Sequence, residues 1–235
     1  MVATKIERHA APLRQQVLRL LREDILEGVL PPGKRMLENS LCENYGVSRT
    51  VIREVLRQLE SENLITMLPG HGPIVTLLTE HDIEALYQVR SVLEGLAGEL
   101  FAIRASKQQA TALRCQIETM EKAYLHGTVQ SREQSKDEFY RLLLEGAANE
   151  VLSEQLHGVH TRIGLLRRFA FVDEKRVETS ISELRRIVQV AAVERDPRKA
   201  RTACEHHIRQ AGELAIIAYR QWRAKEGRLP EGEAG

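Results

Sequence analysis

The chain has 235 residues, and its 34 Lys+Arg nearly balance its 33 Asp+Glu, so the formal net charge is only +1. Hydrophobic residues at 43% and charged residues at 29% are ordinary for a folded protein, while an aromatic content of 4% argues against an aromatic-rich β-sandwich or a base-stacking platform. The small net charge by itself argues against a nucleic-acid partner. Binding in a DNA groove, however, depends on where charges lie rather than on their sum.

Other bulk features predict a cytoplasmic protein with no membrane partner. Three cysteines, an odd number, argue against a disulfide framework and suit a reducing compartment. There is no run of about 18 apolar residues that could span a membrane, and no apolar segment of the secretory type follows the N-terminal charges. We expect Cys42, Cys115 and Cys204 to act as small buried hydrophobic residues rather than as redox sensors.

The density of turn-forming residues changes near Thr79. Residues 1–78 carry most of the Gly and Pro turn signals, with 10 basic and 9 acidic side chains, whereas the remainder has 24 of each and long helical patterns. We therefore predict two domains, residues 1–78 and residues 79–235, in a mainly α protein.

Three helical patterns follow one another in the first domain. The first covers residues 13–26, and the second covers residues 37–45. Gly46 suits the left-handed end of the second helix, and Ser48 can cap the third. The third helix is expected to bury an apolar face made of Val51, Ile52, Val55, Leu56 and Leu59.

A hairpin pattern follows the third helix. Two β-rich runs, residues 64–68 and 74–77, flank a tip of Gly, Pro and His. The predicted order is helix, tight turn, helix and hairpin. This order is that of a winged helix-turn-helix.

A row of arginines lies on the outer face of the third helix. Arg49, Arg53 and Arg57 recur at i, i+4 and i+8. A helix fits the DNA major groove, and guanidinium groups bind guanine or phosphate bidentately. Such a row alone is more often a solvated helix face, but the turn before it and the hairpin after it favour DNA binding.

Two stretches of the first domain resemble the DNA-binding domain of GntR-type bacterial transcription regulators: LPPGKRMLE from Leu30 to Glu38, and YGVSRTVIREVL from Tyr45 to Leu56. The stretch GHGPIV from Gly70 to Val75 is similar to the wing of that family. The resemblance implies a protein that binds double-stranded DNA. The residues that it would place against DNA are Arg35, Ser48, Arg49, Thr50, Arg53, His71 and Gly72.

The second domain reads as an all-α helical bundle. Capping signals begin at Thr79, Ser106, Ser131 and Asp196. The expected helices cover about residues 80–104, 107–126, 132–147, 150–172, 174–194 and 197–224. No convincing strand pattern interrupts them.

The stretch LYQVRSVLE from Leu86 to Glu94 resembles the start of the FCD-type effector-binding domain of the FadR-like GntR subfamily, and later stretches match in the same order. The resemblance implies a homodimer that binds a small effector inside the bundle. Many such domains hold a divalent metal with one Asp and three His. Here those positions fall on Lys136, Tyr140, Arg185 and His207. One imidazole beside two cations lacks the donors that a metal needs, so we predict no metal and no cofactor.

The residues at those positions suit an anion instead. Lys136 and Tyr140 lie one turn apart on one helix face, and Arg185 and His207 would join them from two other helices. Two cations with two hydrogen-bonding groups favour a small anionic effector, a carboxylate such as an organic or sugar acid, or a phosphate.

Arg90 and Arg162 are further candidates for the same pocket. In the alternative interpretation, the cations at these positions pair with acids such as Glu133 or Glu183, or face solvent, and the effector site has decayed.

These features together predict a transcription regulator, by default a repressor, that binds a palindromic operator as a homodimer and responds to the effector. An enzyme built on His206 and His207 is a rival class, but the sequence shows no nucleophile elbow, phosphate loop or paired-acid motif. A winged helix that binds protein rather than DNA is the second rival, and Arg49 and Arg53 argue against it.

Overall fold

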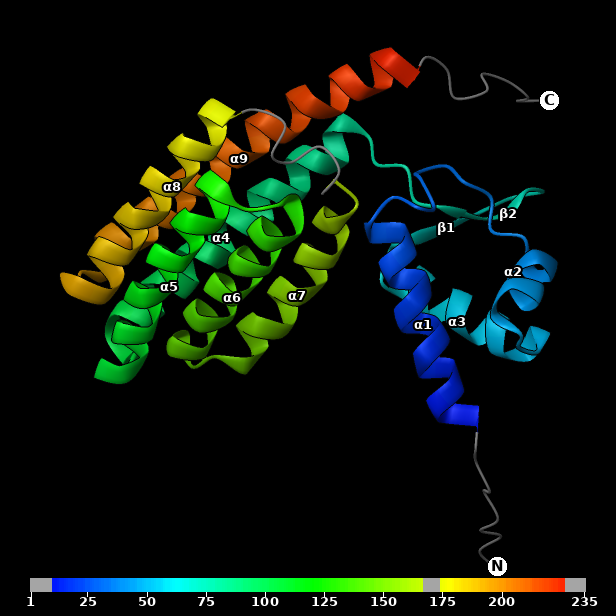
Figure 1. Cartoon of the computed structure of the whole chain (residues 1–235), viewed down its shortest axis with the longest axis horizontal. Helices are drawn as coiled ribbons and strands as arrows, with labels where there is room; N and C mark the ends of the chain where they lie inside the picture. The colour runs from blue at the N-terminus through cyan, green and yellow to red at the C-terminus, as the bar shows by residue number, and fades with distance from the viewer. Residues whose placement is uncertain (1–9, 167–173, 227–235) are drawn as a thin grey trace, which may run out of the picture. The chain divides into compact units, whose positions relative to one another are not determined.

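The computed structural model describes residues 10–166 and 174–226. These residues form two compact units (Figure 1). The first unit contains residues 10–78 together with residues 161–166, and the second contains residues 79–160 and 174–226. The break after Leu78 lies where the turn-rich sequence ends, whereas the grouping of residues 161–166 with the first unit has no counterpart in the sequence pattern.

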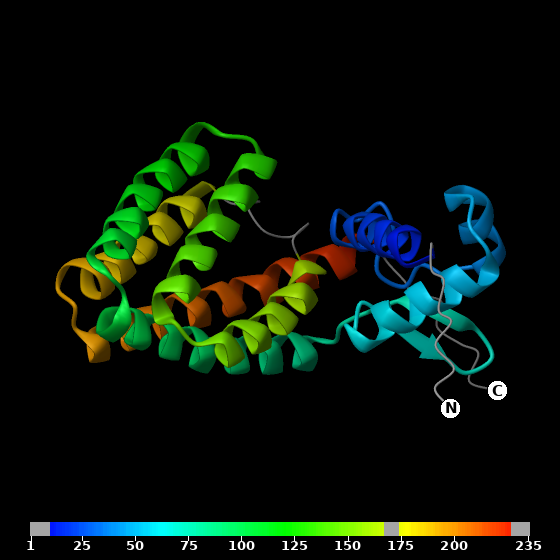
Figure 2. The ribbon, with the colours of Figure 1, turned by 90° about the horizontal axis from the view of Figure 1, so that it is seen from below.

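The first unit is a winged helix-turn-helix, as predicted. Helices α1 (Ala10–Leu26), α2 (Glu38–Tyr45) and α3 (Arg49–Ser61) precede an antiparallel hairpin of β1 (Ile65–Leu68) and β2 (Gly72–Val75). Figure 2 shows the short turn from α2 into α3 and the hairpin that follows. The second strand begins at Gly72 rather than at residue 74, because Gly72 pairs with Leu68 and only the tip between them turns.

Local chemistry explains the turn between α2 and α3. Gly46 ends α2 with φ of 63°, a left-handed conformation that favours glycine. The hydroxyl of Ser48 accepts a hydrogen bond from the amide of Val51 at 3.4 Å and so caps α3. Val51 itself is half-buried. The buried side chains of α1 and α3 are Val17, Leu21, Ile25, Ile52, Val55, Leu56 and Leu59.

The second unit is an all-α bundle in its described part. Its helices are α4 (Glu80–Arg104), α5 (Lys107–His126), α6 (Val129–Ala147), α7 (Glu150–Gly164), α8 (Glu174–Val188) and α9 (Pro197–Glu226). Helix α4 packs along α9 and against α6, and α5 contacts both α6 and α8. Large apolar side chains from these helices, such as Phe101, Leu113, Met120 and Phe139, are fully buried between them. No helix in the described ranges has the length and apolar character that a membrane span requires.

Most helix starts follow the predicted caps. Thr79 and Ser106 form capping boxes, and Asp196 accepts the amide of Lys199 at 3.0 Å. The prediction at Ser131 was wrong, because Thr128 accepts the Ser131 amide at 3.2 Å and starts α6 three residues earlier. The predicted helix over 150–172 is described only as far as Gly164 in α7, and residues 167–173 lie outside the described residues.

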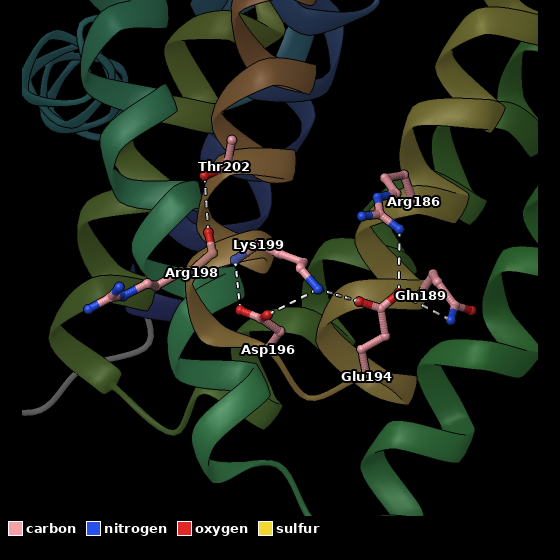
Figure 3. A network of polar contacts seen from close by, with 7 residues as sticks. All are labelled: Arg186, Gln189, Glu194, Asp196, Arg198, Lys199 and Thr202. Atoms are coloured by element: carbon pink, nitrogen blue, oxygen red, sulfur yellow. Dashed lines mark hydrogen bonds and ion pairs between the residues drawn. The ribbon is translucent and has the colours of Figure 1, made fainter.

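The expected single α-helix over 174–194 is not continuous. Helix α8 ends at Val188, and a π-helical segment, η2 (Gln189–Val193), follows. Figure 3 shows the polar network around this turn, in which Glu194 binds Arg186 at 3.4 Å and Lys199 at 3.3 Å. Lys199 also binds Asp196 at 3.3 Å, so side chains from α8 and α9 hold the connection between the two helices.

The cysteines are free thiols in different settings. Cys204 is buried and Cys42 is half-buried, but Cys115 is exposed. The expectation that all three are buried was therefore wrong for Cys115, which lies on the outer face of α5.

Candidate DNA interface and effector site

Helix α3 presents three of the predicted DNA-contacting side chains. Arg49, Thr50 and Arg53 are exposed on the first turns of α3, and Ser48 starts the helix just before them. The apolar face of α3 is buried in the unit. The helix is thus held by one face and offers the other, which carries the guanidinium groups, to a groove.

An acid on α2 holds one of these arginines. The Nε atom of Arg53 donates to both carboxylate oxygens of Glu38, at 2.9 and 3.1 Å. Arg53 remains 61% exposed, and Glu38 is 32% exposed. Because the contact engages only Nε, the two terminal nitrogens keep their capacity to bind another partner. Nothing in a spacing of fifteen residues between Glu38 and Arg53 indicates this pairing.

The wing carries the other predicted contacts. Gly70 and Gly72 adopt φ of 74° and 78°, which side chains rarely adopt. His71 is exposed between them, with Nδ1 3.1 Å from the carbonyl oxygen of Pro69. Arg35 is also exposed and bridges to Ile74 of β2. Arg35 therefore lies beside the second strand of the wing.

We expect Glu38→Gln to reduce the preference for operator over unrelated DNA by about 10-fold. Arg53 would lose its fixed direction, and the loss of a negative charge would strengthen binding to any DNA. Fluorescence anisotropy with both DNAs measures the ratio. Glu43→Gln, at an exposed position of the same helix, is the matched control. An unchanged ratio in Glu38→Gln would show that Glu38 has no positioning role.

A buried polar cluster lies in the second unit. Arg90 and Glu94, one turn apart on α4, form an ion pair with Nε and Oε1 2.6 Å apart and side chains 3% and 2% exposed. Arg90 Nη2 donates to the hydroxyl of Tyr140 on α6 at 3.0 Å, and His160 Nε2 on α7 lies 2.9 Å from Glu94 Oε1. We call Arg90, Glu94, Tyr140 and His160 the Arg90 cluster.

Charges within the Arg90 cluster compensate one another. Burial would raise the pKa of Glu94, but Arg90 and His160 outweigh burial and lower this pKa to about 2. Burial lowers the pKa of His160, and it raises the pKa of the Tyr140 hydroxyl. At neutral pH the cluster therefore contains one cation, one anion, a neutral imidazole and a neutral phenol.

The structure brings only some of the predicted effector residues together. Arg90 and Tyr140 meet in the cluster, and Lys136 is half-buried one turn before Tyr140, close enough for its charge to add to the effect of burial in lowering the pKa of His160. His207 is buried and binds Glu183 at 2.6 Å. Arg185 pairs with Glu121 and is not part of this group.

The remaining predicted effector residues are Arg185 and Arg162. The side chain of Arg185 is 55% exposed and pairs with Glu121 of α5. Arg162 is half-buried in the segment 161–166, which belongs to the first unit. Arg185 therefore pairs with a surface acid and not with the Arg90 cluster.

The π-helical segment explains the position of Arg185. The resemblance placed Arg185 at a ligand position by its place in the sequence, whereas a π turn before Asp196 changes which side of α8 faces the bundle relative to a continuous α-helix. Leu184 is 1% exposed, and Glu183 is the residue that meets His207. Glu94 and His160 were missed in the sequence analysis, and Glu183 was named there as a partner for a cation rather than for His207. Only the i, i+4 spacing of Arg90 and Glu94 carried a signal.

Buried histidines make stability depend on pH. Burial lowers the pKa values of His160 and His207, although Glu94 and Glu183 oppose it. The unfolded chain then binds these protons more tightly, so stability is full above about pH 6.5 and falls below it. We expect the free energy of unfolding in urea to decrease by roughly 1 kcal/mol or more between about pH 7.5 and pH 5.5.

The matched comparison for this pH dependence uses two histidines of the second unit. His207→Asn should flatten the dependence, whereas replacement of the exposed His81 by Asn should leave it unchanged. A free energy of unfolding that is constant or increases toward acid pH would contradict the expectation.

Within the described residues, no three His, Cys, Asp or Glu side chains lie close enough together to hold a metal ion. The buried acids Glu94 and Glu183 are instead paired with Arg90, His160 and His207.

A winged helix with exposed arginines on its second helix-turn-helix member, followed by an all-α unit with a buried polar cluster, defines a DNA-binding transcription regulator with a helical regulatory domain. Residues 13–75 match the model for bacterial regulatory proteins of the gntR family, and residues 84–210 match the FCD domain. The chain belongs to the GntR family of transcription regulators and carries an FCD domain.

Known proteins agree with this assignment. The uncharacterized HTH-type transcriptional regulator YdhC of Bacillus subtilis is 32% identical over 198 residues, 84% of this chain and 86% of the relative. A probable D-xylose utilization operon transcriptional repressor of Paenarthrobacter nicotinovorans is 26% identical over 208 residues, 88% of this chain and 91% of the relative.

The solved structure of McbR/YncC from E. coli shares the fold, with a TM-score of 0.73 and 20% sequence identity. The match covers 94% of this chain and 100% of that chain. The family and these relatives are regulators and not enzymes, which excludes the enzyme interpretation. The FCD domain indicates a small-molecule effector.

Proposed function

We propose that this regulator is a FadR-like repressor that acts in the cytoplasm and binds a palindromic operator as a homodimer. The supporting observation is the exposed face of α3, where Arg49 and Arg53 project from a helix whose other face is buried. One such helix reads few base pairs, so two heads related by a twofold axis would read two half-sites. With a net charge of +1, affinity would depend on these specific contacts more than on a broad basic field.

The remaining contacts follow from the surface of the first unit. Ser48 and Thr50 border the first turn of α3, and Arg35 lies beside the wing. His71 and Gly72 would approach the backbone or the minor groove, because the wing tip has little side-chain bulk. These residues position the helix, and the two α3 arginines read bases.

The effector site that we propose is centred on the Arg90 cluster. Arg90 and the hydroxyl of Tyr140 would bind a carboxylate, and Lys136 on the same face of α6 would add a second cation. Because Glu94 already neutralises Arg90, an incoming anion must replace Glu94 or bind beside it. The His160 side chain is 27% exposed whereas Glu94 is 2% exposed, so the effector would approach from the side of His160.

A gel-shift titration with DNA upstream of the gene tests DNA binding, and footprinting on the bound fragment tests the palindrome. Two protected half-sites in successive major-groove segments are expected. Binding that does not distinguish this fragment from unrelated DNA would contradict the proposal.

A thermal-shift screen of organic acids and sugar acids tests the effector. An acid that raises the melting temperature should also change DNA affinity, and Lys136→Ala should weaken its effect. If no acid changes either quantity, the polar cluster is structural and the effector response has been lost.

A further inference from the structure

An arginine lies on the side of α6 that faces the bundle. One row of side chains on this side consists of Arg132, Lys136, Phe139 and Leu143. Their spacings of four, three and four residues place them on one face of a helix. Phe139 and Leu143 are 0% and 1% exposed, and Arg132 and Lys136 are half-buried. The Arg132 side chain therefore starts on the inner face of α6.

Contacts with α5 fix the turn of α6 that carries Arg132. Helix α6 lies along α5 (Figure 1). Gln116 of α5 donates from Nε2 to the carbonyl oxygen of Ser135 at 2.8 Å, and the hydroxyl of Ser135 donates to the carbonyl oxygen of Arg132 at 3.0 Å. Ser135 itself is buried. The backbone at Arg132 is thus held by the bundle.

The guanidinium group of Arg132 has a buried donor that lacks an acceptor. Among the residues that the structure describes, none accepts a hydrogen bond from its Nε atom, which is shielded from solvent. A buried arginine is normally paired, because an N–H group that leaves water without a new partner costs free energy. Arg90, in the same unit, meets Glu94 in this way. The buried Nε of Arg132 therefore suits an acceptor that arrives with a ligand.

Arg132 lies two helical turns from the Arg90 cluster, with Lys136 between them. Eight residues separate Arg132 from Tyr140, which is about 12 Å along a helix. Burial lowers the pKa of His160, and the charge of Lys136 adds to this effect, so Lys136 lies within electrostatic reach of the cluster. Cationic side chains thus continue along the inner face of α6, away from the proposed effector site.

We propose that Arg132, with Lys136 beside it, forms a second anion subsite, and that the effector carries two anionic groups. This inference rests on the proposed effector site at the Arg90 cluster and names the class of effector. One anionic group would bind at Arg90 and Tyr140, and the other would accept from Arg132. A chain of about six to eight carbon–carbon bonds of about 1.5 Å each spans most of the distance between these places. A carboxylate and a phosphate are both suitable second groups.

The effector-free protein provides the first test. Arg132→Met keeps an unbranched side chain but removes the unpaired donor, so it should raise the melting temperature of the full chain by about 2 °C or more. Arg114→Met, at an exposed arginine of α5, is the matched control and should change it by less than about 1 °C. A melting temperature that falls in Arg132→Met would show that the guanidinium group stabilises the fold, and would overturn the subsite.

Pairs of acids that differ by one anionic group provide the second test. Isothermal titration of the full chain compares adipate with hexanoate, suberate with octanoate, and 6-phosphogluconate with gluconate. In at least one pair, the acid with two anionic groups should bind about 10-fold or more tightly than its counterpart, because it gains a charge-assisted hydrogen bond. The pair that shows the preference distinguishes a second carboxylate from a phosphate. Arg132→Met should remove the preference, whereas Arg114→Met should keep it.

Two failures of this test have different meanings. If acids bind but the singly anionic one binds as tightly in every pair, or if Arg132→Met retains the preference, the second subsite is overturned and the proposed effector site stands. If no acid of either kind binds to the wild-type protein, the proposed effector site and this inference are overturned together.

Discussion

Replacing Arg49 and Arg53 by alanine together should weaken operator binding by at least about 100-fold. A bidentate arginine contact with a base contributes about 1–3 kcal/mol of discrimination, and a homodimer would lose each contact twice. Both side chains are exposed, and the buried face of α3 does not include them. The loss should therefore appear in DNA affinity and not in stability.

Fluorescence anisotropy with operator and unrelated DNA measures this effect, and thermal unfolding checks the fold. Arg19→Ala is the control, because Arg19 is an exposed arginine on α1 that pairs with Glu23 one turn away. Sequence-specific binding that survives in the double variant would refute α3 as the reading helix. A similar loss in Arg19→Ala would show that only general electrostatics had been measured.

Replacing Arg90 by methionine should destabilise the second unit by about 3–5 kcal/mol, because it leaves Glu94 buried without its counter-ion. Arg141→Met is the matched control. Arg141 pairs with Glu138 and Glu145 on the surface of α6 and is 58% exposed, so its loss should cost at most about 1 kcal/mol. Urea denaturation of both variants gives the comparison.

The pH dependence of the stability difference distinguishes the unpaired charge of Glu94 from a simple loss of packing around Arg90. In the wild-type protein the pKa of Glu94 is lowered to about 2, so its contribution to stability is present above about pH 4.3 and is lost as pH falls toward 2. Without Arg90, burial would raise the pKa of Glu94 and favour its neutral form. The difference in stability should therefore shrink as the pH falls from 7 toward about 4.

The double variant Arg90→Met, Glu94→Leu provides a second check. It removes both charges and should recover much of the lost stability, because a buried ion pair can be replaced by apolar side chains of similar size. A difference between wild type and Arg90→Met that does not change with pH would contradict the role assigned to the ion pair.

Most helix starts were predictable because they depend on near neighbours. Ser48, Thr79 and Ser106 each bind an amide three residues along the chain, so the signal and its effect lie within one turn. The prediction failed at Ser131, because Thr128 offers an equivalent cap and sequence spacing does not rank the two.

The pairing of charges was less predictable. Arg53 binds Glu38, fifteen residues away and on another helix, and Arg185 binds Glu121 rather than the cluster that its position suggested. The predicted helix over 174–194 is interrupted, because α8 gives way to a π-helical segment at Gln189. A spacing rule assumes one continuous helix, so it fails where that helix is interrupted.

The sequence by itself determined the family and the helix that carries the exposed arginines, because both depend on short motifs whose residues lie within a few turns of each other. Only the tertiary structure decided which acid meets each cation: Glu94 beside Arg90 and His160, Glu183 beside His207, and Glu38 beside Arg53. Except for Arg90 and Glu94, these partners come from different helices. Their contacts depend on the rotation of one helix against another, which packing sets and residue spacing does not record.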